Sequence, residues 1–195
     1  IRKKGAKKLC GEIRDHLVDL NFLDVKFELH FETLDGYTSL GKDDVEFLIS
    51  VNPGEPLRPL MKIASGGELS RIMLAIKTVL ADKDDIDAVI FDEIDVGISG
   101  RTAQRVSEKM MLIGKTRQVI CITHLAQIAA MADSHYRIEK MVNNGETRTR
   151  IRKLKQTEEI EELARILGGA EITDAVMKNA EEMKHLADAK KSEKK

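Results

Sequence analysis

The sequence predicts an α/β fold with a mostly parallel sheet, flanking helices and an antiparallel hairpin. Short apolar runs at 86–91 and 119–122 alternate with helical patterns, which is typical of a parallel sheet. Apolar and charged residues alternate over 25–32, which indicates a strand with one buried face. Near the end of the chain, Asn143-Asn144-Gly145 separates two strand patterns, and Asn-Gly supplies the positive φ angles of a tight turn. We expect this hairpin to close the sheet.

The composition is that of one ordinary globular domain. The 195 residues are 42% hydrophobic and 33% charged, which excludes a disordered or membrane-embedded chain. The net charge of -1 gives no overall basic field, so a nucleic-acid partner would need a local patch. Cys10 and Cys121 provide neither a disulfide framework nor a zinc site, which indicates a reducing, cytosolic compartment. No apolar run is long enough to cross a membrane, so no membrane partner is expected.

The first third of the chain is predicted to hold one helix and one pair of strands. Apolar residues recur at helical spacing over 1–20, and strands at 25–32 and 45–49 pair across a loop. All three prolines lie within 53–59, which predicts a rigid loop. The chain begins without methionine and inside the helical pattern, so we expect it to be a fragment.

The rest of the chain alternates helices with strands. Helices are predicted at 69–82, 102–113, 128–131, 157–167 and 171–190. The pair Gly168-Gly169 separates the last two, and the lysine-rich end is expected to fray.

Two adjacent acids give the strongest chemical signal. Asp92 and Glu93 end the apolar run 86–91, where a phosphate-bound Mg²⁺ and an attacking water would sit. Asp92 would hold the water shell of the metal, and Glu93 would polarise the water. The structural alternative is that the two acids simply end a strand and start a loop.

A second signal stands at the start of a helix. Ser65-Gly66-Gly67-Glu68 combines glycines, which let backbone N–H groups approach an anion, with a helix N-terminus that favours negative charge. A phosphate could therefore dock here. Taken alone, the same four residues are better explained as a turn followed by a helix cap.

These motifs form one ordered set that also includes Asp95 and, after the second apolar run, His124. The set resembles the second half of ABC-type ATPases. The resemblance implies a signature motif at Ser65 to Glu68, a Walker B motif at Ala88 to Glu93, a D-loop at Asp95 and a switch histidine at His124. A lone histidine at a strand end is more often structural, and only its place in the set supports a role as γ-phosphate sensor.

Within this superfamily the chain resembles the RecN family of SMC-like bacterial DNA repair proteins. The resembling stretches are 52–56, 63–75, 91–100 and 123–129. Transporter subunits usually carry Gln at the position of Glu68 and lack the Asp95-Val96-Gly97-Ile98 form of the loop. A transporter nucleotide-binding subunit is therefore the weaker alternative, together with a non-catalytic module that only pairs heads.

The family resemblance implies an ATPase that uses ATP and Mg²⁺ in the recombinational repair of DNA double-strand breaks. Two heads would pair as a homodimer around two ATP molecules, and Ser65 would contact the γ-phosphate of ATP held by the opposite head. The Walker A loop would lie upstream, before a coiled coil whose returning end is residues 1–20. Residues 21–195 would then form the C-terminal lobe of the head, and this chain alone would be inactive.

One stretch imitates the missing phosphate-binding loop. Gly36 to Lys42 fits the first seven positions of a Walker A motif, but Asp43 stands where Ser or Thr must bind Mg²⁺. No helical pattern follows, so we predict a hairpin loop here. The basic cluster from Arg2 to Lys8 could touch DNA, although a solvated helix face is the better interpretation.

Overall fold

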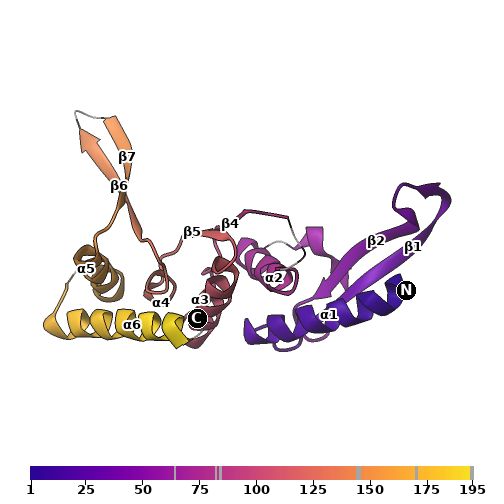
Figure 1. Ribbon diagram of the computed structural model, residues 1–195, viewed down its shortest axis with the longest axis horizontal. Coiled ribbons are helices and arrows are strands. Elements are labelled where there is room, and N and C mark those ends of the chain that lie inside the picture. Colours follow the sequence, from indigo (N-terminus) through magenta and orange to yellow (C-terminus); the bar gives the residue numbers. More distant parts are fainter. Residues whose placement is uncertain (64, 82, 84, 144–145, 170, 194–195) are drawn as a thin grey trace. The chain divides into compact units, whose positions relative to one another are not determined.

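The computed structural model describes residues 1–63, 65–81, 83, 85–143, 146–169 and 171–193 (Figure 1). The chain divides into two compact units. The first comprises residues 1–98 and 112–122, and the second comprises residues 99–111 and 123–195.

The first unit is built on a helix and an antiparallel sheet. Helix α1 (Arg2–Asp19) packs on strand β1 (Lys26–Thr38) and on helix α2 (Gly66–Val79). Strand β2 (Gly41–Ser50) pairs with β1 and with the short strand β3 (Arg58–Pro59), which leads into a 3-10 turn at Leu60–Lys62. The side chains of Ile13 and Leu17 are fully buried where α1 meets these elements.

The predicted strand pair in this unit is confirmed. Phe27 lies opposite Ile49, and Phe31 lies opposite Val45. The register therefore places alternate apolar residues on one face, as their spacing in the sequence requires. The rings of Phe27 and Phe47 also approach each other, with 5.3 Å between their centroids.

The stretch that imitates a Walker A loop is a hairpin, as predicted. Thr38 is the last residue of β1, Gly41 opens β2 with a φ of 107°, and the Thr38 hydroxyl donates a hydrogen bond to the Gly41 carbonyl at 2.9 Å. Strand β2 continues directly through Lys42, so this loop has no helix N-terminus that could bind a phosphate.

The two apolar runs form a parallel pair, also as predicted. Strand β4 (Ala88–Phe91) lies beside β5 (Gln118–Cys121), and Val89 is opposite Val119. Helix α3 (Gly100–Gly114) connects the two strands. This pair is the parallel part of the described chain, and the antiparallel strands form sheets of their own.

Short, continuous apolar runs such as 86–91 and 119–122 favour strands that are buried on both faces, but these two strands are not. Ile90 is 66% exposed, and Ile120 and Ile122 are 44% and 49% exposed. Parallel strands are normally covered on both faces, because the connections between them pack there. One face of the pair therefore lacks a covering layer among the described residues of the first unit.

The second unit is a small helical core that carries a hairpin. Its elements are the first part of α3, α4 (Ala126–Ala129), β6 (Tyr136–Asn143), β7 (Glu146–Lys153), α5 (Gln156–Gly168) and α6 (Asp174–Glu193). The core consists mainly of alanines, among them Ala129, Ala130, Ala164 and Ala180, which pack around Leu163. Small residues let α4, α5 and α6 approach closely. None of the helices that the structure describes is long and apolar enough to cross a membrane.

The hairpin does not close the parallel sheet. Strands β6 and β7 pair only with each other among the described strands, which corrects the expectation from the sequence. Turn residues 144–145 lie outside the described residues, as do the tail residues 194–195. The pattern of Asn-Gly and alternating residues specifies the local hairpin, but it carries no information about which distant strand would pair with it.

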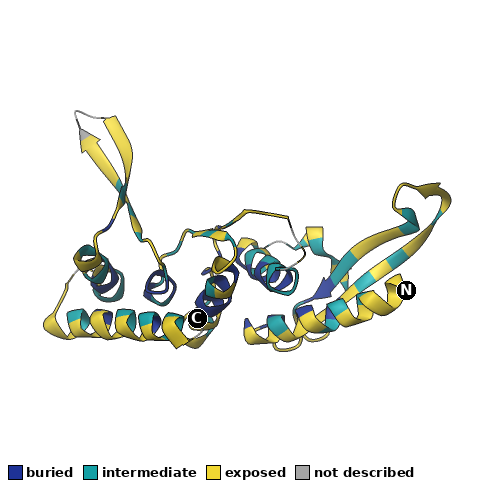
Figure 2. Ribbon diagram, viewed as in Figure 1, coloured by how far each residue is buried: buried dark blue, intermediate teal, exposed yellow. Residues whose placement is uncertain are grey.

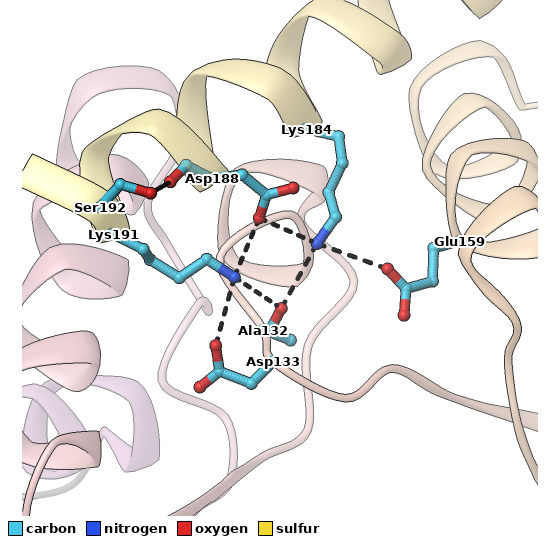
Figure 3. Close-up of polar contacts among 7 residues, drawn as sticks. All are labelled: Ala132, Asp133, Glu159, Lys184, Asp188, Lys191 and Ser192. Atoms are coloured by element: carbon cyan, nitrogen blue, oxygen red, sulfur yellow. Dashed lines mark hydrogen bonds and ion pairs between the residues drawn. The ribbon is translucent and has the colours of Figure 1, made fainter.

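Ion pairs hold α6 against the rest of the second unit (Figure 3). The Lys184 ammonium lies 3.4 Å from both the Glu159 and the Asp188 carboxylates, and Lys191 donates to the Ala132 carbonyl and the Asp133 carboxylate at 3.2 Å. Partial burial would raise the pKa of Asp188, but the two lysines outweigh this effect and lower it. This network secures the C-terminal turns of α6.

Candidate functional site

Helix α2 begins at the Ser-Gly-Gly-Glu motif. Ser65 has an extended backbone, and its hydroxyl accepts a hydrogen bond from the Glu68 N–H at 3.4 Å. Ser65 is therefore an N-cap, which satisfies one of the N–H groups that the first turn leaves without a helical partner. The structural interpretation of this motif, a turn followed by a helix cap, is confirmed.

The carboxylate of Glu93 lies against this helix end. A Cβ atom built on Gly66 would stand 2.0 Å from Glu93 Oε2, so any other residue at this position would push the flexible Glu93 side chain aside. Glu93 follows β4 with a φ of 57°, an unusual value for a residue other than glycine, and its N–H donates to Asp92 Oδ1 at 2.9 Å. The structure thus brings the predicted water-polarising acid and the predicted phosphate-binding motif together.

The turn after Glu93 packs directly on Gly67. A Cβ atom at Gly67 would lie 2.9 Å from the Val96 carbonyl oxygen and 3.0 Å from the Glu93 carbonyl oxygen. Within this turn the Val96 N–H donates to the Glu93 carbonyl at 3.0 Å, and Asp95 is only 3% exposed. The turn and the helix therefore form one packed assembly in which glycine is required at position 67.

A buried arginine holds the same turn in place. Arg71 Nη1 donates to the carbonyl oxygens of Ile94 at 3.3 Å and Val96 at 2.7 Å, and its guanidinium lies 5.5 Å from the centre of the Phe22 ring. Burial lowers the pKa of Arg71, and its Nε has no hydrogen-bond partner among the described residues. The sequence reasoning missed this residue. The available signal was a lone arginine among the apolar positions of α2.

An open groove of about 430 Å³ runs between α2 and β4. Leu69, Met73 and Ile90 line its walls, and Asp92 and Glu93 lie at its end. The volume is within the range of small-molecule sites, which also have mainly apolar walls. The groove is lined in part by the exposed strand β4.

His124 lies in the other unit. It is an exposed residue in the segment between β5 and α4, where the Leu125 N–H donates to the Thr123 hydroxyl at 3.0 Å. Helix α2, which begins at the predicted signature motif, belongs to the first unit together with Asp92, Glu93 and Asp95. The role of His124 as a sensor of the γ-phosphate stays a prediction.

No described group of three His, Cys, Asp or Glu side chains is arranged to hold a metal ion. Mg²⁺ is usually bound through one or two carboxylates together with phosphate oxygens and waters. Asp92, which directly follows β4, supplies one carboxylate and is compatible with this type of site.

Cys121, at the end of β5, has a strongly perturbed thiol. Burial together with the negative charges of Asp95 and Asp92 raises its pKa to about 12. At pH 9 about a thousandth of the thiol would then be ionised, compared with half for an ordinary thiol of pKa 9.0. Burial also raises the pKa of Cys10.

We expect both thiols to resist alkylation by iodoacetamide in the folded protein, because only the thiolate reacts. Mass spectrometry after timed exposure at about pH 8.5 should show little modification, and unfolding in urea should make both sites reactive. Fast modification of folded Cys121 would contradict the packing described around Asp92 and Asp95.

No protein-family profile matches the chain. Among individual proteins, the DNA repair protein RecN of Halalkalibacterium halodurans is 47% identical over 191 residues, which cover 96% of this chain and 34% of that protein. RecN of Bacillus subtilis is 43% identical over 98% of this chain and 36% of that protein. The chain corresponds to the C-terminal part of RecN. It spans about a third of the length of these relatives.

Solved SMC heads share the fold. The Smc head domain with a coiled coil and joint from Pyrococcus yayanosii has a TM-score of 0.56 at 19% identity, over 80% of this chain and 28% of that chain. An Smc head from Pyrococcus furiosus, bound to the C-terminal domain of ScpA, has a TM-score of 0.54 at 19% identity, over 82% of this chain and 37% of that chain. The RecN-like chain therefore has the α/β fold of the C-terminal lobe of an SMC-type head.

Proposed function

We propose that the chain is the C-terminal lobe of an ATPase head in a RecN protein that acts in the bacterial cytosol on broken DNA. The observation that carries this proposal is the close approach of Glu93 to the start of α2, where its carboxylate lies against Gly66 and its backbone carbonyl oxygen lies against Gly67. The relatives are named DNA repair proteins, and one SMC structure with a TM-score of 0.50, 19% identical over 84% of this chain and 94% of that chain, is described by ATP-driven dimerization and DNA-stimulated activation.

The residues of the site would serve two nucleotides. Asp92, Glu93 and His124 would act on the nucleotide of this head, and the start of α2 would act on that of the opposite head. Asp92 would orient the water shell of Mg²⁺, and Glu93 would accept a proton from the water that attacks the γ-phosphorus. The N-terminus of α2, with Ser65 and the two glycines, would stabilise negative charge on a phosphate through its N–H groups. Asp95 would position the turn that joins these groups, and His124 would contact the γ-phosphate.

The phosphate that binds α2 would come from the nucleotide of a second head. Glu93 and a phosphate carry the same sign of charge, so the Glu93 carboxylate must turn away from Gly66 before a phosphate docks there. Pairing of two heads in a homodimer would bring this phosphate to α2, and its negative charge would repel the Glu93 carboxylate from Gly66. In this arrangement each ATP site is shared between two chains.

The exposed parallel strands fit a lobe that is completed by another segment. Ile90, Ile120 and Ile122 form the bare apolar face, which the Walker A half of the head would cover. Residues 1–20 would be the returning end of a coiled coil, and residues 21–195 the lobe itself. We therefore infer that the isolated chain neither binds ATP tightly nor hydrolyses it.

The shared site is tested with the chain joined to the half that precedes it. Ser65→Arg should abolish ATP-dependent dimerisation, measured by light scattering with and without Mg-ATP, because a large side chain replaces the group nearest the phosphate. Ser65→Asn is the matched control, since asparagine keeps the helix cap. The isolated chain should show no magnesium-dependent turnover.

Two outcomes would favour the other candidates. Dimerisation that is indifferent to nucleotide would indicate a non-catalytic pairing module. Loss of dimerisation in both Ser65 variants, with lowered melting temperatures, would show only that the cap is needed for folding. The transporter alternative has no support in the relatives found, which are DNA repair proteins.

A further inference from the structure

The hairpin of β6 and β7 concentrates positive charge. Residues 136–155 contain seven basic residues and two acidic ones, a net charge of +5, in a chain whose total charge is -1. The basic residues are Arg137, Lys140, Arg148, Arg150, Arg152, Lys153 and Lys155. This segment is the local basic patch that the overall composition does not reveal.

The charges lie on both faces of a two-stranded ribbon. Arg148 is opposite Met141 and Arg150 is opposite Glu139 on one face, and the strand alternation places Lys140 and Lys153 on the other. The ribbon is exposed over nearly its whole length (Figure 2). A partner can therefore approach it from either side.

At the base of the ribbon the basic residues pair with acids of α5, whereas in its outer part Glu139 lies opposite Arg150 and Glu146 pairs with Arg148. Arg137 lies 3.4 Å from the buried carboxylate of Glu162, and Arg152 lies 2.6 Å from Glu158, both on α5. These pairs fix the ribbon to the helical core. Further out, the Arg148 side chain is 77% exposed, and its pair with Glu146 at 3.0 Å is also exposed and therefore weak.

We infer that the outer part of this hairpin binds the phosphate backbone of duplex DNA. Arg148 and Arg150 supply planar guanidinium groups, which suit phosphate oxygens, and Lys140 adds charge on the opposite face. A two-stranded ribbon is narrow enough to enter the major groove, where basic groups on its two faces reach phosphates on both walls. This role goes beyond the proposed nucleotide site, and only the choice of DNA among polyanions rests on the proposed repair function.

The test removes charge from the outer ribbon only. Arg148→Ala/Arg150→Ala spares Arg137 and Arg152, which anchor the hairpin to α5. Binding of the full-length protein to a fluorescent random-sequence duplex is measured by anisotropy over a series of salt concentrations. The plot of log affinity against log salt should become shallower by about 2, and affinity near 0.1 M salt should fall roughly 10- to 100-fold.

Two control variants separate phosphate contacts from general charge. Arg148→Lys/Arg150→Lys keeps both charges and should retain most of the salt dependence. Lys7→Ala/Lys8→Ala removes two charges from α1 and should leave binding close to wild type. The inference is overturned if the double alanine variant binds like wild type, or if the α1 variant loses as much affinity.

The outcome is independent of the nucleotide site. ATP turnover without DNA should be unchanged in the hairpin variants, so unaltered DNA binding with intact turnover would reject the hairpin and not the ATPase. If the double alanine variant binds DNA like wild type but no longer binds an acidic protein partner, the ribbon binds protein instead.

Discussion

Replacing Glu93 by glutamine should leave ATP bound to the assembled head and slow its hydrolysis about 10²- to 10⁴-fold. Glutamine has nearly the same shape as glutamate, so it can occupy the same space beside Gly66. That space is open because residue 66 has no side chain. The change removes only the proton acceptor. Transition-state stabilisation should therefore fall without a matching loss of substrate binding.

The measurement compares nucleotide affinity with turnover in a protein that contains both halves of the head. A fluorescent ATP analogue reports binding, and phosphate release reports hydrolysis. Asp92→Asn provides the contrast, because loss of the charge that faces Mg²⁺ should weaken magnesium-dependent binding itself. Weak binding with normal turnover in Glu93→Gln would assign Glu93 to nucleotide binding and remove it from the chemical step.

Replacing Gly67 by alanine should destabilise the first unit by about 1–3 kcal/mol. The added methyl group would meet the carbonyl oxygens of Val96 and Glu93 at 2.9 and 3.0 Å, and these backbone atoms cannot rotate away as a flexible side chain could. The turn must shift instead. Because the turn carries Glu93, hydrolysis by the assembled head should fall together with stability.

A second glycine supplies the control for this experiment. Gly11 lies within α1 and has no atom within 4 Å of a Cβ built on it. Gly11→Ala should therefore stabilise the protein by about 0.5–1 kcal/mol, since alanine favours helix. Denaturant unfolding compares the two variants. Equal stability of Gly67→Ala and wild type would mean that the turn adapts without cost.

Short-range patterns in the sequence determined the local structure. The alternation over 25–32 specified which face of β1 is apolar, and the motif at Ser65 specified where α2 begins, because both depend on residues a few positions apart. The same patterns placed Asp92 and Glu93 at the end of β4 and excluded a phosphate-binding loop at 36–42.

Tertiary structure alone decided how these pieces meet. Arg71 binds carbonyl groups more than twenty positions away, and Glu93 reaches Gly66 only because β4 packs beside α2. The exposed face of Ile90 and the separate sheet of β6 and β7 also contradict what their patterns predicted. Periodicity shows which face of an element is apolar. Which distant surface covers that face depends on packing, and packing is a property of the whole fold.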